Sequence, residues 1–189
     1  GPDGEGHWIE DNVGLGHRRL SVIDLSIAGY QPMVSADHRY WLSYNGEVYN
    51  FRELRKELKA KGYWFRSKTD TEVVLNALAE WGTKALIRFN GMFAFALWDR
   101  KEQKLLLARD RYGIKPLYVS HQEKIFAFGS EQKAILKIPG LKRKIDRAAL
   151  LEYFTFQNIF TDRTLLEDIK LLPAGHFATL DLKTDNPTL

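Results

Sequence analysis

Five residues at the ends of expected secondary-structure elements carry the chemistry needed to hold an amino acid. Arg19 lies in an otherwise apolar, strand-like stretch, and Asp70 opens a helix-like one. Asn45, Gly46 and Glu47 end a second strand-like stretch. Together they supply a guanidinium, two carboxylates, a carboxamide and a glycine N–H. These groups suit the two charges of a zwitterionic amino acid and a developing oxyanion, although the sequence contains no complete catalytic apparatus of a common type.

Taken one at a time, these residues also have structural explanations. Asp70 could serve only to favour the positive end of a helix, and Arg19 could be a charge on an edge strand. The Asn45–Gly46 pair in "YNGEVYN" is typical of a two-residue hairpin turn. However, the residues that follow it, "NFRELRKELKAKG", have a helical pattern where a hairpin needs a second strand.

The first half of the chain is expected to contain strands and then two helices. Residues 13–25 and 40–44 have the pattern of strands, and a stripe formed by Phe51, Leu54 and Leu58 predicts the first helix. The second helix is predicted over 70–81, with Val74, Leu78 and Trp81 on one face. The helix boundaries are predicted by two capping boxes and two terminal glycines: Asn50 with Glu53, Thr69 with Glu72, Gly62 and Gly82.

After residue 90 the pattern changes to short apolar strands separated by charged turns. The segments "GMFAFALWD", "KLLLARD", "KPLYVSH" and "KIFAFGS" predict a meander, and "FAFAL" at 93–97 is apolar enough to be buried on both faces. Ser130 and Asp146 are expected to cap helices near 131–137 and 147–155. The closing stretch "IKLLPAGHFATLDL" predicts two strands around a turn. The whole predicts one α+β domain with antiparallel sheets.

Several classes of site are excluded or unsupported by the composition. The chain has no cysteine, which excludes disulfides, thiolate metal sites and a cysteine nucleophile within these 189 residues. The net charge of +4 is spread out, and the run Lys142, Arg143, Lys144 fits a solvated turn, so we expect no nucleic-acid partner. No apolar stretch is long enough to span a membrane, and we expect a cytoplasmic protein. The scattered histidines predict structural or exposed roles and no metal site: His7, His17, His38, His121 and His176.

Along its whole length and in order, the chain resembles the glutamine-hydrolysing domain of asparagine synthetase. That domain is a class II glutamine amidotransferase of the N-terminal-nucleophile hydrolase superfamily. The resemblance rests on the following stretches: "GPDGEG" at 1–6, "GHRRLSVIDLS" at 16–26, "QPM" at 31–33, "YNGEVYNFRELRKEL" at 44–58, "TDTEVVLNAL" at 69–78, "NGMFAFALWD" at 90–99, "LLLARDRYGIKPLYV" at 105–119 and "LLPAGH" at 171–176.

The resemblance implies a four-layer αββα sandwich of antiparallel sheets over residues 1–189. It implies that Arg19 pairs with the α-carboxylate of L-glutamine, and that Glu47 and Asp70 hold its α-ammonium. It also implies an oxyanion hole made by the Asn45 side chain and the Gly46 N–H. The parent enzyme would hydrolyse L-glutamine to glutamate and ammonia, for the ATP-dependent amidation of aspartate.

The chain departs from the family pattern in lacking the cysteine nucleophile. We therefore expect a domain truncated at its N-terminus and catalytically inactive as it stands. The synthetase domain of the same polypeptide, with its ATP and magnesium, would be a partner absent from this sequence, so no cofactor is expected here. A missing leading strand would expose strand edges, which predicts some self-association.

Two alternatives stay open. The chain could be an amidotransferase-like pseudo-enzyme that serves as an interaction or regulatory module. It could also belong to a related synthetase with a different acceptor, since acceptor choice would lie in the synthetase domain.

Overall fold

The computed structural model describes residues 3–19 and 27–184 of the chain and divides it into two compact units. Unit 1 comprises Gly1–Leu107 with Ala178–Leu189, and unit 2 comprises Ala108–Phe177. The predicted strand at 13–25 is confirmed over its first part, whereas residues 20–25 lie outside the described residues.

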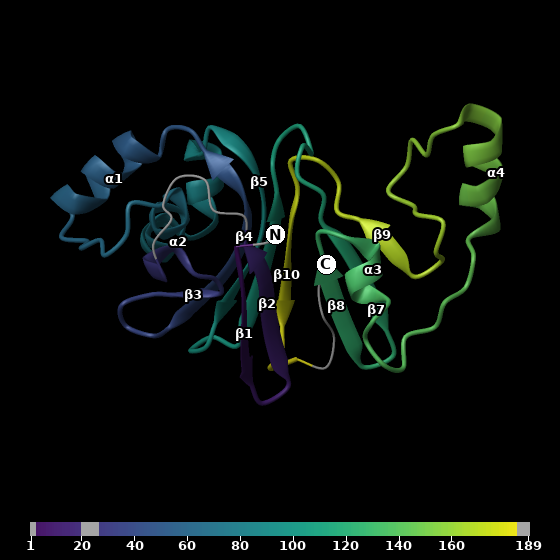
Figure 1. Cartoon of the computed structure of the whole chain (residues 1–189), viewed down its shortest axis with the longest axis horizontal. Coiled ribbons are helices and arrows are strands. Elements are labelled where there is room, and N and C mark those ends of the chain that lie inside the picture. The colour runs from purple at the N-terminus through teal and green to yellow at the C-terminus, as the bar shows by residue number, and fades with distance from the viewer. Residues whose placement is uncertain (1–2, 20–26, 185–189) are drawn as a thin grey trace. The chain divides into compact units, whose positions relative to one another are not determined.

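Unit 1 contains a hairpin, most of a larger sheet and two α-helices (Figure 1). Its elements are β1 (Gly4–Glu10), β2 (Val13–Arg19), η1 (Ile27–Gly29), β3 (Met33–Val34), β4 (Tyr40–Val48), α1 (Phe51–Ala60), α2 (Asp70–Trp81), η2 (Gly82–Arg88) and β5 (Gly91–Asp99). Strands β6 (Lys104–Arg109) and β10 (Phe177–Asp181) complete the larger sheet, and the boundary between the units passes through both of them.

The five-stranded sheet has the order β10-β6-β5-β4-β3, which makes β5 the central strand. Strand β4 pairs antiparallel with β5 along its whole length, from Tyr40 opposite Asp99 to Val48 opposite Gly91. All residues of β5 from 93 to 98 are buried. The prediction that "FAFAL" is central and buried on both faces is therefore confirmed.

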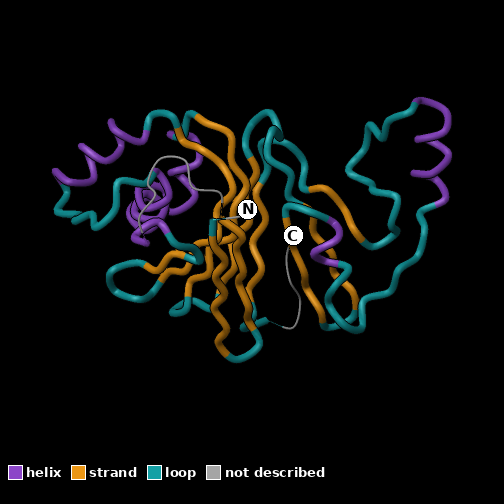
Figure 2. The backbone as a smooth tube through the Cα atoms, in the orientation of Figure 1, coloured by secondary structure: helices purple, strands orange, loops and turns teal. Residues whose placement is uncertain are grey.

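Helices α1 and α2 lie on the same side of this sheet, in contact with each other, and α2 also contacts β4 (Figure 2). Leu54 and Leu58 of α1 are buried, as the stripe predicted. Helix α2 differs from the prediction of a single apolar face, because every residue from 70 to 78 is buried. A helix enclosed in this way fixes its N-terminal residue, Asp70, within the packed part of unit 1.

The hairpin formed by β1 and β2 pairs antiparallel, with Gly4 opposite Arg19. It lies against the other face of β4: the Ser43 hydroxyl donates to the Gly16 carbonyl at 2.9 Å, and Trp8 stacks on Trp41 with ring centroids 4.7 Å apart. Strand β4 is thus covered by a helix on one side and a hairpin on the other.

Unit 2 contains a three-stranded sheet with the order β8-β7-β9, in which both pairings are antiparallel. Its elements are β7 (Tyr118–Gln122), β8 (Ile125–Gly129), α3 (Gln132–Ile135), α4 (Arg147–Phe156) and β9 (Ile169–Leu171). Ala127, Ile135 and Ile169 form its buried cluster. The two closing strands were expected around one turn; β9 joins this sheet, while β10 belongs to the larger one.

The predicted helix caps are confirmed in part. Asp146 accepts the Ala148 and Ala149 N–H groups at the start of α4, as expected. Asn50 precedes α1 but makes no capping bond, because its side chain instead bonds the Arg88 carbonyl and the Asn90 N–H, both at 3.0 Å. The residue that caps α3 is Glu131, so the assignment to Ser130 was wrong by one position.

Candidate active site at the edge of strand β4

Strand β4 presents alternate N–H groups to two different edges, and this alternation organises the site. In an antiparallel pair, every second residue bonds to the neighbouring strand and the others point away from it. Tyr49 donates to the Asn90 carbonyl at 2.8 Å, which continues the β5 side of the ladder. Residues 42, 44, 46 and 48 therefore direct their N–H groups to the opposite edge.

That opposite edge is covered by a strand only at its beginning. Strand β3 pairs with Trp41 and Leu42, and within residues 3–19 and 27–184 no strand pairs with the edge beyond them. The Tyr44 N–H is taken by the side-chain oxygen of Gln31 at 2.6 Å, and the Val48 N–H by a carboxylate oxygen of Asp70 at 3.0 Å. The Gly46 N–H points to the same edge, between these two occupied positions.

A side chain at position 46 would collide with β5. An ideal Cβ there would lie 2.3 Å from the Met92 carbonyl oxygen and 2.7 Å from the Phe93 Cα. The neighbouring atoms are backbone in a buried central strand and cannot move aside cheaply. Glycine is therefore required for β4 to keep this register at the point where Gly46 lies.

Asp70 joins the first turn of α2 to β4. Its side chain is only 5% exposed, and one oxygen accepts both the Val48 N–H and the Tyr44 hydroxyl, the latter at 2.8 Å. Burial raises the pKa of Asp70 above that of an ordinary aspartate, while the bonds from Val48 and Tyr44 act in the opposite direction. A carboxylate in this position gains from any cation that reaches it.

The loop before α2 is fixed by a second set of buried hydrogen bonds. Thr69 accepts the Glu72 N–H, as the capping box predicted. The Glu72 carboxylate does not return to Thr69 and bonds the Ser67 N–H at 2.7 Å and the Ser67 hydroxyl at 2.6 Å. Arg55 of α1 donates to the Ser67 and Thr69 carbonyls, both at 2.8 Å. The position of Asp70 is thus set by α1, β4 and its own loop.

Arg19 ends β2 close to this loop. Its side chain is only 7% exposed and lies over the Tyr30 ring, 5.5 Å from the centroid. The point where a Cβ of Gly29 would lie is 2.3 Å from an Arg19 Nη and 3.0 Å from a Thr69 methyl carbon. The structure therefore brings the guanidinium next to the residue that precedes Asp70, and the absence of a side chain at Gly29 makes this approach possible.

Asn45 and Glu47 lie in the same part of β4 but on its other face. Side chains alternate along a strand, so these two share the face of Ser43, which is covered by the hairpin. His17 also lies on the inward side of that hairpin; burial lowers its pKa to about 4, which leaves it neutral at pH 7. Arg19 therefore supplies the positive charge at this end of β2.

The structure corrects one boundary at the site. Asn45, Gly46 and Glu47 were expected to end a strand, and the pair Asn45–Gly46 also had the signature of a turn. They lie inside β4, which continues to Val48. The ladder with β5 holds the Asn–Gly pair extended, because β5 runs unbroken opposite all of these residues.

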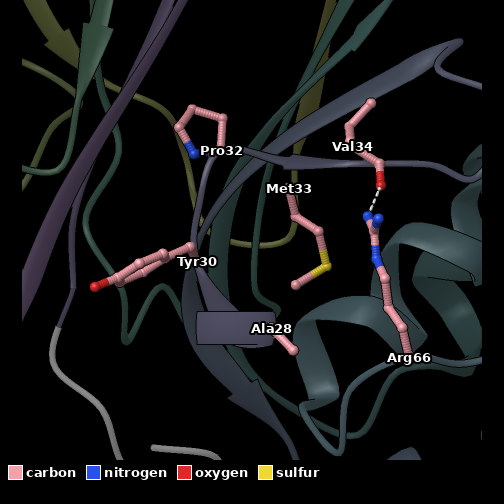
Figure 3. A pocket seen from close by; sticks show the side chains of 6 residues that line it. All are labelled: Ala28, Tyr30, Pro32, Met33, Val34 and Arg66. Atoms are coloured by element: carbon pink, nitrogen blue, oxygen red, sulfur yellow. Dashed lines mark hydrogen bonds between the residues drawn. The ribbon is translucent and has the colours of Figure 1, made fainter. Parts of the chain in front are cut away.

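Two contributors, Gln31 and Tyr44, were not singled out from the sequence. Gln31 fell within the "QPM" stretch, and Tyr44 within "YNGEVYN", but nothing in either pattern reveals a bond to a residue far along the chain. A small recess also lies beside this region, lined by Ala28, Tyr30, Pro32, Met33, Val34 and Arg66. Figure 3 shows Arg66 reaching the Val34 carbonyl across it, and none of the five predicted site residues lines it.

The described residues contain neither a metal-binding cluster nor a membrane-spanning helix. No group of three or more histidine, aspartate or glutamate side chains is arranged to hold a metal ion. No helix among them is long and apolar enough to cross a bilayer.

The chain has the fold of a glutamine amidotransferase domain. The chain matches the glutamine amidotransferase domain family over residues 1–188 and belongs to that family. It is 42% identical over 182 residues to an asparagine synthetase (glutamine-hydrolysing) of Bacillus subtilis, covering 95% of this chain and 30% of that protein. A second B. subtilis asparagine synthetase is 40% identical over 180 residues, with 95% and 28% covered. The chain thus spans less than a third of these relatives.

Solved structures support the fold. The glutamine phosphoribosylpyrophosphate amidotransferase of B. subtilis superposes with a TM-score of 0.59 at 18% identity, over 92% of this chain and 35% of that one. A structure described as the allosteric regulatory enzyme of purine biosynthesis gives a TM-score of 0.62 at 19% identity, over 90% and 33%. The prediction of an α+β fold with antiparallel sheets, of the N-terminal-nucleophile hydrolase type, is confirmed.

Proposed function

We propose that this chain is the L-glutamine-binding part of an asparagine synthetase-type enzyme. In the parent protein it would release ammonia from L-glutamine, leaving glutamate, for the ATP-dependent amidation of aspartate. The observation that carries the proposal is the arrangement at β4, where the Gly46 N–H lies between two occupied N–H groups and beside a buried carboxylate. The names of the relatives supply the substrate.

The proposed roles follow from the chemistry of each group. Arg19 pairs with the α-carboxylate of L-glutamine, while Asp70 and Glu47 hold its α-ammonium. The Gly46 N–H and the Asn45 carboxamide donate to the oxygen that becomes negative when the amide is attacked. Because the donors are fixed by the strand, they need little reorganisation as charge develops.

We propose that the nucleophile is not supplied by these 189 residues, which contain no cysteine. In this family's chemistry a cysteine thiol attacks the amide carbon, and ammonia leaves. The chain alone would then bind L-glutamine without hydrolysing it. ATP and magnesium would belong to a synthetase domain of the same polypeptide, and we propose a cytoplasmic location for the whole protein.

Calorimetric titration of the 189-residue chain with L-glutamine tests the binding proposal. We expect Arg19→Ala and Asp70→Ala each to weaken binding by about 30-fold or more, which corresponds to roughly 2–5 kcal/mol for a desolvated charge contact. Arg18→Ala is the matched control, because Arg18 is an exposed neighbour that pairs with Glu5. Absence of L-glutamine binding by the unmodified chain would contradict the proposal.

Kinetics of the full-length parent test the catalytic roles. Arg19→Ala and Asp70→Ala should remove glutamine-dependent synthesis and leave ammonia-dependent synthesis intact, since ammonia needs no glutamine pocket. Asn45→Ala should lower kcat with little effect on affinity, because its donor acts mainly on the oxyanion. Equal loss of both activities would mean that these residues only maintain the fold.

Because these 189 residues contain no cysteine, a pseudo-enzyme is the second candidate function. In that case the domain binds L-glutamine, or a partner, without chemistry in any context. A full-length protein that binds L-glutamine but releases no ammonia from it would favour this alternative.

A further inference from the structure

We propose that Gln31 and Tyr44 are positioning residues that hold the edge of β4 so that the Gly46 N–H meets the ligand. The inference rests on the proposed L-glutamine site and adds two residues to it. Neither is expected to touch the reacting atoms.

Two side chains, those of Gln31 and Asp70, act on opposite sides of Gly46. On one side, the Gln31 oxygen accepts the Tyr44 N–H at 2.6 Å, and Gln31 is 9% exposed. On the other side, Asp70 accepts the Val48 N–H at 3.0 Å. Each occupied N–H lies two residues from Gly46. These two hydrogen bonds, called the clamp below, therefore fix the strand immediately before and after Gly46.

Tyr44 connects both halves of this clamp. Its N–H bonds Gln31 and its hydroxyl donates to Asp70 at 2.8 Å, and its side chain is only 3% exposed. Edge strands normally leave such N–H groups free to pair with another strand. Here two side chains occupy the flanking groups and leave the central one directed at the site.

The Tyr44 hydroxyl also stabilises the charged form of Asp70. Its bond to the carboxylate opposes the effect of burial on the pKa of Asp70. Removing the hydroxyl should therefore raise the pH at which Asp70 loses its charge and its hold on an ammonium group. The other charged or titratable groups around Asp70 and its partner Tyr44 come from helix α2, from β4 and the residue after it, from α1 and from β2: Glu72, Glu47, Tyr49, Arg55 and Arg19.

Two substitutions with matched controls test the proposal. Tyr44→Phe removes the hydroxyl and keeps the ring; Gln31→Met keeps the length and removes the oxygen acceptor. Tyr63→Phe is the first control, because the Tyr63 hydroxyl also donates to a carboxylate, that of Glu80 at 3.2 Å. Gln122→Met is the second, because the Gln122 oxygen accepts the Lys142 N–H at 2.8 Å.

The first readout is L-glutamine affinity of the 189-residue chain across pH. We expect Tyr44→Phe and Gln31→Met to weaken binding about fivefold to twentyfold at pH 7, and the two controls by less than about twofold. In Tyr44→Phe the loss of affinity on acidification should also begin at higher pH than in the unmodified chain. Unchanged affinity and an unchanged pH profile in both variants would overturn the proposal.

The second readout is amide hydrogen exchange without any ligand. In the unmodified chain the Tyr44 and Val48 N–H groups should exchange more slowly than the Gly46 N–H, and Gln31→Met should accelerate exchange at Tyr44 selectively. Exchange at Tyr44 as fast as at Gly46 in the unmodified chain would overturn the proposal. This outcome does not depend on whether the variants fold. If the clamp is seen by exchange but the unmodified chain binds no L-glutamine, the proposed function fails and the clamp stands as a structural feature.

Discussion

Two buried aspartates, Asp70 in unit 1 and Asp110 in unit 2, are used in opposite ways. Asp110 is fully buried and follows β6 in the loop of residues 110–115. One of its oxygens accepts the Tyr112 and Ile114 N–H groups at 3.1 and 3.0 Å, and the other accepts the Lys115 N–H at 3.0 Å. Both oxygens thus serve the backbone of a single turn.

Asp70 is bonded less locally. Its carboxylate also accepts from the N–H groups of residues 70 and 71, but the bonds from Tyr44 and Val48 reach one of its oxygens from a strand more than twenty residues away in sequence, and burial raises its pKa. A carboxylate whose charged form is disfavoured by burial is typical of functional sites, where a ligand supplies the missing charge. We propose that Asp110 stabilises a loop, whereas Asp70 is positioned to bind a cationic group of a ligand.

The largest difference should appear on replacing each carboxylate by its amide. Asp110→Asn places an NH₂ group where one oxygen now accepts a backbone N–H, so a buried donor is left unpaired. We expect a loss of about 3 kcal/mol in the free energy of unfolding, measured by urea denaturation. Asp162→Asn is the control in unit 2, since Asp162 is exposed and lies 4.0 Å from Lys170. A loss no greater than that of the control would contradict the structural role of Asp110.

Asp70→Asn should have the opposite effect: stability should be kept and L-glutamine affinity lost. The amide oxygen can still accept from Tyr44 and Val48, and the cost of burying a charge disappears. We expect the free energy of unfolding at pH 7 to change by less than about 1 kcal/mol, or to increase, as at other functional sites under strain. L-glutamine affinity should fall by about 30-fold or more. Loss of stability with retained affinity would reverse our assignment of the two aspartates.

The pH dependence of stability should separate the unmodified chain from Asp70→Asn. The pKa of Asp70 is higher in the folded than in the unfolded state. At low pH, where Asp70 is protonated in both states, its ionisation therefore does not lower the free energy of unfolding. The destabilisation of the folded state develops as pH rises through the unfolded-state pKa near 3.8, and it is complete above the raised folded-state pKa. Thermal unfolding from pH 3 to 7 should therefore show the unmodified chain losing stability relative to Asp70→Asn as pH rises. Parallel curves would contradict the raised pKa.

These residues also show how far the sequence could predict the molecule. Local patterns identified the central strand at 93–97, the cap at Asp146 and the terminal glycines of α1 and α2, since these depend on nearby residues. The five site residues were chosen together because of their chemistry, and the structure places Arg19 and Asp70 near one loop.

The failures have one physical cause, which is competition from distant partners. Asn50 was expected to cap α1, but it bonds residues near 90 instead. Asn45 and Gly46 had a turn signature that pairing with β5 overrides. Gln31 and Tyr44 matter through bonds spanning 13 and 26 positions, which no local spacing rule can predict.

The smallest effect we expect concerns two arginines. Arg109 bonds the loop that contains Asp110, and Arg55 bonds the loop that precedes Asp70. Arg109 donates to three carbonyls, those of Gly113, Lys115 and Leu172, at 2.6–2.8 Å. Arg55 donates to two, those of Ser67 and Thr69. Lysine cannot reproduce such planar, multiple donation.

We therefore expect Arg109→Lys to lower the free energy of unfolding by about 1–2 kcal/mol without affecting L-glutamine binding. Arg55→Lys should cost less stability, about 1 kcal/mol or below, but should weaken L-glutamine binding about twofold to threefold, because the loop it releases carries Asp70. Urea denaturation and calorimetric titration of both variants provide the check. If Arg55→Lys leaves the affinity unchanged, the loop before α2 does not set the position of Asp70, and the strand bonds from Tyr44 and Val48 alone must hold it.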